Sequence, residues 1–558
     1  MTSEEELLIE DVDLVFIFTF DLGAKVVNVH ELIEAFAKSY SLVEACWHPP
    51  GEPYPTPVAI YIAAKKLGRI NSKMTLKEFI DRGLDRELWD DEHVREEITR
   101  LHVLFREMIK VDGHALNPQY LKLGRYIRSK LVGLEAEVVE PAKIEADDRQ
   151  IQEFMRERVR GFRIEPYLLI HNAGIGIVTA WINLKGKFTT DDIITLERRL
   201  DEIKLNVKDA FGHQYESITL GEFVDGVIAT PLQAAVLFKD RYEDFERVFE
   251  ALERDKIGMN EIIEGLRNEY TTWHVIVGVK EVACGHGCFT AEDVVKRHVK
   301  EVAGILSRRK SWRDYRISAA EEDLGRNLSA YEHYASYVDI GSSLFLSSPK
   351  LGKEIDTVEF REFLLHLVTP VEFLVLSCEI LDVYYSLYRK KVKQFQEVKI
   401  RGKLLNPSEY MELRSELTEA LEEYRHVAFF ISDPPRSILE CGKERYKLTE
   451  WENVLSSALD ELAELARTHY DERFAKSQLV LTVVFGIFGI FAEIEFLERL
   501  VGLQWAMAGA AMTVAALVLF YRWYMGIPYR KFWPLRQKVG RAENTEAGSA
   551  TPRKETEK

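Results

Sequence analysis

The sequence predicts a cytoplasmic domain of the α+β or α/β class, followed by long helices and a stalk helix that continues into a two-helix transmembrane hairpin. Three observations predict this fold class. Short apolar runs rich in β-forming residues alternate with amphipathic segments up to about residue 310. Long helical patterns replace them from residue 369. Two uncharged apolar runs then precede a basic C-terminal segment.

The composition indicates a globular chain rather than a nucleic-acid binder. Its 558 residues leave room for roughly two to four domains, and 46% of them are hydrophobic. A formal net charge of −17 disfavours nucleic acid as a partner, because phosphates are neutralised by Lys and Arg. The five cysteines are too few for a disulfide framework, so we expect a reducing, cytoplasmic location. The N-terminal residues also lack the basic and apolar regions of a signal peptide.

Residues 1–310 are expected to form the cytoplasmic α/β domain, with an antiparallel or mixed sheet. Runs rich in β-branched and aromatic residues predict strands, and amphipathic runs predict helices. The expected strands are 14–20, 58–63, 166–170, 175–184 and 273–279, and the expected helices are 30–39, 191–204 and most of 75–130. Residues 171–174 (His-Asn-Ala-Gly) are a hairpin signal between two of these strands. Residues 311–368 are assigned to a connecting region.

Residues 369–476 are expected to form a helical stalk region with coiled-coil packing. The helical patterns cover 370–398, 408–430 and 448–491. Pro370 suits the first position of a helix, where a proline costs no hydrogen bond. Neither Gly nor Pro interrupts 448–485, so the last soluble helix should run directly into the first membrane span.

Two apolar runs predict the transmembrane hairpin. Residues 477–492 are sixteen residues without a charge, and residues 500–521 are twenty-two. At 1.5 Å per residue they span about 24 Å and about 33 Å, against a hydrocarbon core of about 30 Å. We assign the spans to 477–497 and 500–521, with Lys476 reaching toward the interface. A buried core helix is the alternative for the first run.

The charged flanks predict a multi-pass protein of the cell membrane with both termini in the cytoplasm. Lys and Arg dominate the segment after the second span, and residues 522–558 form a basic tail whose end we expect to be disordered. The loop between the spans instead carries Glu493, Glu495 and Glu498 with a single arginine. The positive-inside rule therefore places this acidic loop outside.

One polar stripe continues from the stalk through the first span. At 100° per residue, its membrane part falls within an arc of roughly 80°. This part consists of Gln478, Thr482, Gly486, Gly489 and Glu493. Two interpretations are open: close helix packing on small residues, or a water-filled pore lined by this face in an oligomer. The spread of polar residues along the span favours the pore.

The segment Cys284-Gly-His286-Gly-Cys288 is the one sequence pattern with metal-ligand character. Two thiolates and an imidazole can ligate zinc, but a structural site needs four ligands, so His274 or His298 would have to supply the fourth. A Gly-rich turn after a strand is the preferred interpretation. No P-loop, dinucleotide fingerprint or catalytic grouping is present in the sequence, so we expect neither an enzyme nor a bound cofactor.

The layout resembles that of the CorA-like divalent-cation transporters. The resemblance rests on the α/β domain, the stalk helix that enters the first of two C-terminal spans, the acidic outer loop and the basic tail. The Gly-Met-Asn signature of that family is absent from the hairpin, where residues 491–496 read Phe-Ala-Glu-Ile-Glu-Phe; a Gly-Met-Asn occurs only upstream, at 258–260. The resemblance implies a homopentamer and a divalent cation such as magnesium as the transported or sensed ion.

We therefore expect a homo-oligomeric protein of the lipid bilayer that acts as a cation channel or transporter. The alternative is a membrane-anchored interaction or regulatory module without transport activity. A third hypothesis is a membrane-tethered enzyme, which would need a concave pocket with convergent polar groups within residues 1–310.

Overall fold

A computed structural model describes most of the chain before residue 502. The described residues are 6–21, 29–38, 42–115, 125–140, 149–159, 161–237, 272–284, 287–400, 407–427 and 433–501, with residues 508, 511, 512 and 515. The chain divides into two compact units, Met1–Leu465 and Ala466–Lys558.

The first unit is built on one mixed sheet of twelve strands, which agrees with the expected α/β class. Along its main path the strand order is β11-β12-β10-β1-β7-β6-β4-β2-β3, and β5, β8 and β9 branch from β6. Every pairing is antiparallel except that of β10 with β12. The strands are β1 (Leu8–Asp21), β2 (Val43–Trp47), β3 (Tyr54–Pro55), β4 (Tyr126–Leu131), β5 (Leu134–Val138), β6 (Gly161–His171), β7 (Ile175–Phe188), β8 (Leu205–Asp209), β9 (Gln214–Ile218), β10 (Thr272–Ala283), β11 (Tyr334–Asp339) and β12 (Ser342–Ser347).

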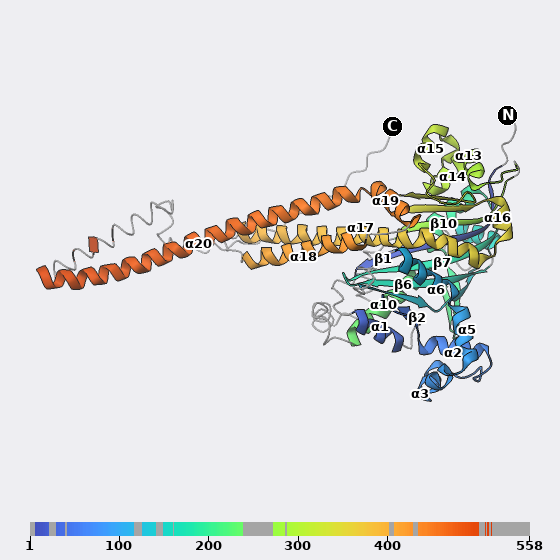
Figure 1. Cartoon of the computed structure of the whole chain (residues 1–558), viewed down its shortest axis with the longest axis horizontal. Helices are drawn as coiled ribbons and strands as arrows, with labels where there is room; N and C mark the ends of the chain where they lie inside the picture. The colour runs from blue at the N-terminus through green and yellow to red at the C-terminus, as the bar shows by residue number, and fades with distance from the viewer. Residues whose placement is uncertain are drawn as a thin grey trace, which may run out of the picture. The chain divides into compact units, whose positions relative to one another are not determined.

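Helices cover the sheet and extend beyond it (Figure 1). They are α1 (Val29–Lys38), α2 (Pro57–Lys66), α3 (Leu76–Asp81), α4 (Leu84–Trp89), α5 (Glu92–Leu101), α6 (Val103–Ala115), α8 (Arg149–Arg158), α9 (Thr190–Arg199), α10 (Leu220–Leu237), α13 (Ala291–Arg297), α14 (Val299–Leu306), α15 (Ile317–Leu324), α16 (Pro349–Glu354), α17 (Thr357–Ile400), α18 (Pro407–Val427), α19 (Pro435–Arg445) and α20 (Leu448–Val501).

β1 is the central strand, and its alternation gives the sheet two different faces. It pairs with β10 on one side and with β7 on the other, so both of its edges are hydrogen-bonded. Leu14, Phe16 and Phe18 belong to the main apolar core together with residues of α1, α9, α10 and α14. Asp13 and Thr19 bond to side chains of α17 on the opposite face. Period-two alternation therefore separates an apolar layer from a polar one.

Several predicted strands are confirmed, although each is longer than its apolar run. The run 14–20 lies in β1, and 273–279 lies in β10. The predicted hairpin is formed by β6 and β7, which pair antiparallel, and Gly174 in the turn has φ +82°. Glycine suits this turn because side chains disfavour positive φ.

The expected strand at 58–63 is wrong, because these residues lie in α2. Thr56 has extended N-cap dihedrals and Pro57 stands in the first turn, which favours a helix start. The residues from Val58 to Ala64 are mostly buried without a period-two pattern, because α2 is enclosed by α3, α4 and α5. Periodicity alone does not separate a short buried helix from a strand.

The expected helical segment 75–130 and the connecting region 311–368 both contribute strands. β4 occupies the end of the first segment and pairs with β2 and β6. β11 and β12 lie within 311–368 and form one end of the sheet path. The sheet therefore extends past the expected boundary at residue 310, because β12 pairs with the distant strand β10.

The helix expected to start at Pro370 begins earlier, at Thr357, and Pro370 lies inside the 44-residue helix α17. An internal proline removes a helix hydrogen bond. Tertiary packing offsets this cost, because Leu364, Val368 and Val371 are fully buried around it. α17 contacts β1, β7 and β10, and at Gly278 an added Cβ would lie 2.5 Å from Leu364.

One helix among the described residues, α17, contains a stretch long and apolar enough to cross a membrane. This stretch is Thr357–Phe395, and 89% of its most apolar window is buried inside the protein. It therefore has the burial of a core helix. A shorter apolar stretch, Ser477–Ile490, lies in α20.

Candidate functional site

The 54-residue helix α20 carries the predicted pore face. Its first turns are held within the first unit by α17 and α18: Tyr388 donates to Glu461 at 2.7 Å, and Arg425 pairs with Glu452 at 2.9 Å. The helix continues without interruption through Ser477–Ile490 to Val501. The expected stalk helix and first apolar run therefore belong to one helix.

Most apolar side chains of this stretch of α20 are exposed. Val480 is 61%, Phe485 66% and Phe488 67% exposed. A contiguous apolar surface in water is unfavourable and marks contact with lipid or with another protein surface. α20 therefore differs from α17, whose apolar side chains pack inside the first unit.

The residues of the predicted stripe lie on this helix. Gln478, Thr482 and Gly489 are exposed, and Gly486 is partly exposed. The Thr482 hydroxyl donates to the carbonyl of Gln478 at 2.8 Å, so it has a hydrogen-bond partner within the helix. The backbone of α20 is helical at Glu493, Glu495 and Glu498, but the structure does not describe the side chains of these three residues. Most of the predicted second span, 500–521, and the tail 522–558 lie outside the described residues.

A buried charged layer joins the sheet to α17, and sequence reasoning missed it. Arg128 of β4 contacts Glu372 of α17 at 2.6 Å and Asp112 of α6 at 3.2 Å, and all three side chains are fully buried. Thr179 of β7 donates to Glu372 at 2.6 Å, and Tyr126 donates to Asp112 at 2.9 Å. Burial raises the pKa of Asp112 to about 6, although Arg128 opposes the shift.

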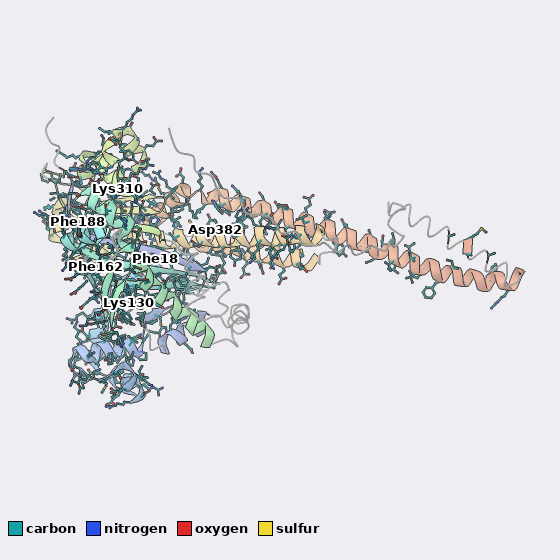
Figure 2. The ribbon with its side chains drawn as sticks, turned by 180° about the vertical axis from the view of Figure 1, so that it is seen from behind. Phe18, Lys130, Phe162, Phe188, Lys310 and Asp382 are labelled. Carbon is teal, nitrogen blue, oxygen red and sulfur yellow. The ribbon has the colours of Figure 1, made fainter. Side chains whose placement is uncertain are left out.

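The same layer continues along α17. Arg361 contacts Asp13 of β1 at 2.8 Å and Glu165 of β6 at 3.2 Å. Thr19, near the end of β1, donates to Glu379 at 2.7 Å. Figure 2 labels Asp382, which lies where α17 extends beyond the sheet. In the sequence, the buried charged layer is indicated by carboxylates inside the apolar helical run of α17, because charges are rarely buried without partners.

A cysteine–histidine–glutamate cluster lies at the end of β10. The Sγ atoms of Cys284 and Cys288 are 2.6 Å apart, and His298 Nε2 is 3.7 Å from Cys284 Sγ. His298 Nδ1 is 2.5 Å from Glu301 Oε2. Of the two histidines considered as a fourth zinc ligand, His298 therefore lies near the thiols, whereas His274 contacts Tyr446 and Ser343.

The zinc interpretation of this segment stays a prediction. His286 lies outside the described residues. Among the residues that the structure describes, no group of three or more His, Cys, Asp or Glu side chains is arranged to hold a metal ion. Glu301, which sequence reasoning did not select, is the partner that orients His298.

An open cavity of about 400 Å³ lies between the C-terminal ends of α9 and α14. It is lined by Glu197, Arg198, Asp201, Ser307 and Arg308. Glu197 is 3% exposed, and neither of its carboxylate oxygens has a hydrogen-bond partner among the described residues. Burial raises the pKa of Glu197 to about 8, and Arg308 opposes the shift. Arg308 has φ +53°, an unusual backbone for a non-glycine residue.

No family model, curated protein or solved structure matches this chain.

Proposed function

We propose that this chain is a homo-oligomeric membrane protein whose α20 helices line a pathway for cations. The observation that carries the proposal is the exposed apolar stretch of α20, together with the polar and small residues that share one of its faces. Lipid would cover the apolar side chains. Copies of the same helix would cover Gln478, Thr482 and Glu493.

Hydration free energy supports this arrangement. A glutamate in a membrane helix costs about 2.5–3.5 kcal/mol near the bilayer centre, and less near an interface. Gln478 and Glu493 are on the same face, so one assembly around a central axis removes both from lipid. Gly486 and Gly489 on that face permit close approach or expose carbonyl groups to an ion.

The acidic end of the span provides the electrostatic part of the proposal. A ring of Glu493 side chains at the outer mouth would concentrate cations. Glu495 lies about 200° further around a continued helix, so it would not join the ring. The CorA-like resemblance makes a divalent cation such as magnesium the first ion to test and a pentamer the expected assembly.

The proposed topology places the first unit and both termini in the cytoplasm of a multi-pass cell-membrane protein. The acidic segment between the two spans faces outward, and the basic tail faces inward. The buried charged layer then joins the cytoplasmic sheet to α17, which packs against the start of α20 through Tyr385 and Trp451. We propose no catalytic activity for this assembly.

A membrane-anchored regulatory module without transport activity is the second candidate. The hydrogen bond from the Thr482 hydroxyl within α20 favours it, because this side chain needs no water-filled pore. Gly486 and Gly489 are equally compatible with plain helix packing.

Cation flux into liposomes distinguishes the two candidates. We expect Glu493→Gln to reduce magnesium-dependent flux of the full-length protein more than Glu495→Gln does, since only the first position faces the proposed axis. Glu495→Gln is the matched control for the loss of one outer charge. Flux that is absent in the unmodified protein, or unchanged in both variants, would favour the anchored module.

A further inference from the structure

We propose that Cys284 and Cys288 form a redox-active dithiol that a hydroperoxide or a small disulfide converts to an intramolecular disulfide. His298 accepts the proton of Cys284, and Glu301 positions His298. The proposal is independent of ion transport and assigns a reactive site to the loop between β10 and α13.

The geometry gives each residue a separate role. His298 Nε2 lies 3.7 Å from Cys284 Sγ, and Cys288 Sγ lies 2.6 Å from the same sulfur. Glu301 holds His298 Nδ1 through one oxygen and accepts from the backbone N–H of Leu7 at 2.7 Å through the other. With a proton on Nδ1, the Nε2 atom beside Cys284 Sγ is the acceptor of the thiol proton, so Glu301 sets the useful tautomer.

The local elements hold this chain of contacts in place. β10 ends at Ala283, directly before Cys284. Thr290 caps α13 in a capping box with Asp293, and His298 lies where α13 meets α14. His298 and Glu301 are nearly buried, so their orientation is fixed by packing. Cys284 is partly exposed as a residue, in contrast to the buried Cys288.

The surrounding charges agree with these roles. Burial and the neighbouring Cys284 raise the pKa of Cys288 to about 12, with Arg297 opposing and Asp293 assisting the shift. The contact with His298 places Cys284 as the attacking sulfur, and Cys288 is the sulfur that resolves the intermediate. Burial opposes protonation of His298, but its hydrogen bonds with Glu301 and Cys284 raise its pKa overall. The imidazolium formed by proton transfer is thereby stabilised.

The reaction with a hydroperoxide takes place in two steps. The Cys284 thiolate bonds the distal peroxide oxygen, the O–O bond breaks, and the alcohol leaves with the proton held by His298, which gives a sulfenic acid on Cys284. Cys288 then attacks this sulfur and releases water. Two thiols and one hydroperoxide thus give one disulfide, one alcohol and one water. With a small disulfide, two thiol molecules leave instead.

The other cysteines provide an internal comparison. Cys46 and Cys378 are buried, and burial raises the pKa of the Cys46 thiol to about 12 and that of Cys378 further still. Cys441 is partly exposed, like Cys284. Cys441 is therefore the control for simple accessibility.

The test uses reduced, full-length protein in detergent, treated separately with hydrogen peroxide and with oxidised glutathione. We expect peptide mass spectrometry to find a Cys284–Cys288 disulfide before Cys441 is modified. In Cys288→Ser, dimedone should trap a sulfenic acid on Cys284 after peroxide, and glutathione should remain bound there after the second oxidant. The faster of the two reactions identifies the oxidant class.

Glu301→Gln tests the positioning role. A glutamine can still accept from Leu7, but its amide donates to Nδ1 and turns the protonated Nε2 toward the thiol. The oxidation rate at neutral pH should fall by about 10-fold or more, and the rate–pH profile should move to higher pH, while alkylation of Cys441 is unchanged. His298→Asn should have the same effect. Oxidation of Cys441 at the rate of Cys284, or stoichiometric zinc that shields both thiols until it is chelated, would overturn the proposal.

Discussion

At the scale of single residues, Glu197 is a carboxyl group whose burial has no compensating hydrogen bond among the described residues. Its pKa is about 8, against 4.5 for an ordinary glutamate. In the folded protein it therefore keeps its proton at neutral pH. The unfolded chain, with the lower pKa, loses that proton first.

This difference predicts a pH-dependent stability. Between pH 4.5 and about 8 the unfolded state binds one proton fewer, so the free energy of unfolding should fall by up to about 1.4 kcal/mol per pH unit. Glu197→Gln should remove this slope and stabilise the protein at pH 8. Urea unfolding at several pH values measures it, with the exposed Glu78→Gln as control. Equal slopes in the unmodified protein and in Glu197→Gln would show that the carboxyl is solvated.

The buried Arg128 gives a second prediction at this scale. Glu372→Ala would leave the guanidinium of Arg128 and the hydroxyl of Thr179 without their partner in the sheet–α17 layer. Removing one member of a buried pair costs about 3–5 kcal/mol. An exposed pair is worth about 0–1 kcal/mol, so Glu292→Ala, which breaks the contact with Lys296, should have little effect. Urea unfolding followed by tryptophan fluorescence compares the two, and similar losses would contradict a fully buried network.

At the scale of elements, α17 and α20 show how similar composition serves different surroundings. Both are long helices with apolar stretches. α17 is enclosed by the sheet, α6, α18 and α19. The apolar side chains of α20 within Ser477–Ile490 are mostly exposed. Burial, and not hydropathy, separates the core helix from the candidate membrane helix.

Cysteine crosslinking tests which face of α20 meets its copies. In a background without reactive native cysteines, Thr482→Cys and Gly489→Cys should form inter-subunit disulfides in membranes. Val480→Cys and Val484→Cys lie off the polar stripe and should crosslink much less. Preferential crosslinking at 480 or 484 would assign the self-contacting surface to the apolar face and remove the support for a pore.

At the scale of the whole molecule, the charge pattern predicts the orientation of the proposed membrane protein. An impermeant maleimide applied to intact cells should label Glu498→Cys in the outer segment but not Ser549→Cys in the tail. Labelling of both positions, or of the tail alone, would contradict the proposed topology.

The assembly state is a separate prediction. A pore of α20 helices requires several copies around one axis, five if the CorA-like resemblance extends to assembly. Native mass spectrometry of the detergent-purified protein gives the number of copies. A monomer would exclude the proposed pore and leave the anchored module.

The sequence by itself determined the features that depend on local patterns. β1, the β6–β7 hairpin and the uninterrupted helix α20 follow from apolar periodicity, turn residues and the absence of helix breakers. The apolar run within α20 was visible in the sequence for the same reason, whereas its exposure is seen only in the structure. Local patterns were insufficient at residues 58–63, where the same short apolar run fits a buried helix or a strand.

Tertiary structure alone decided the contacts between distant segments. It placed β12 beside β10, enclosed Pro370 within α17, and brought His298 with Glu301 to the Cys284–Cys288 pair. It also paired the carboxylates of α17 with arginines and hydroxyls of the sheet. The reason is physical: burial and charge pairing depend on which side chains share a place in three dimensions, and spacing along the chain does not specify that place.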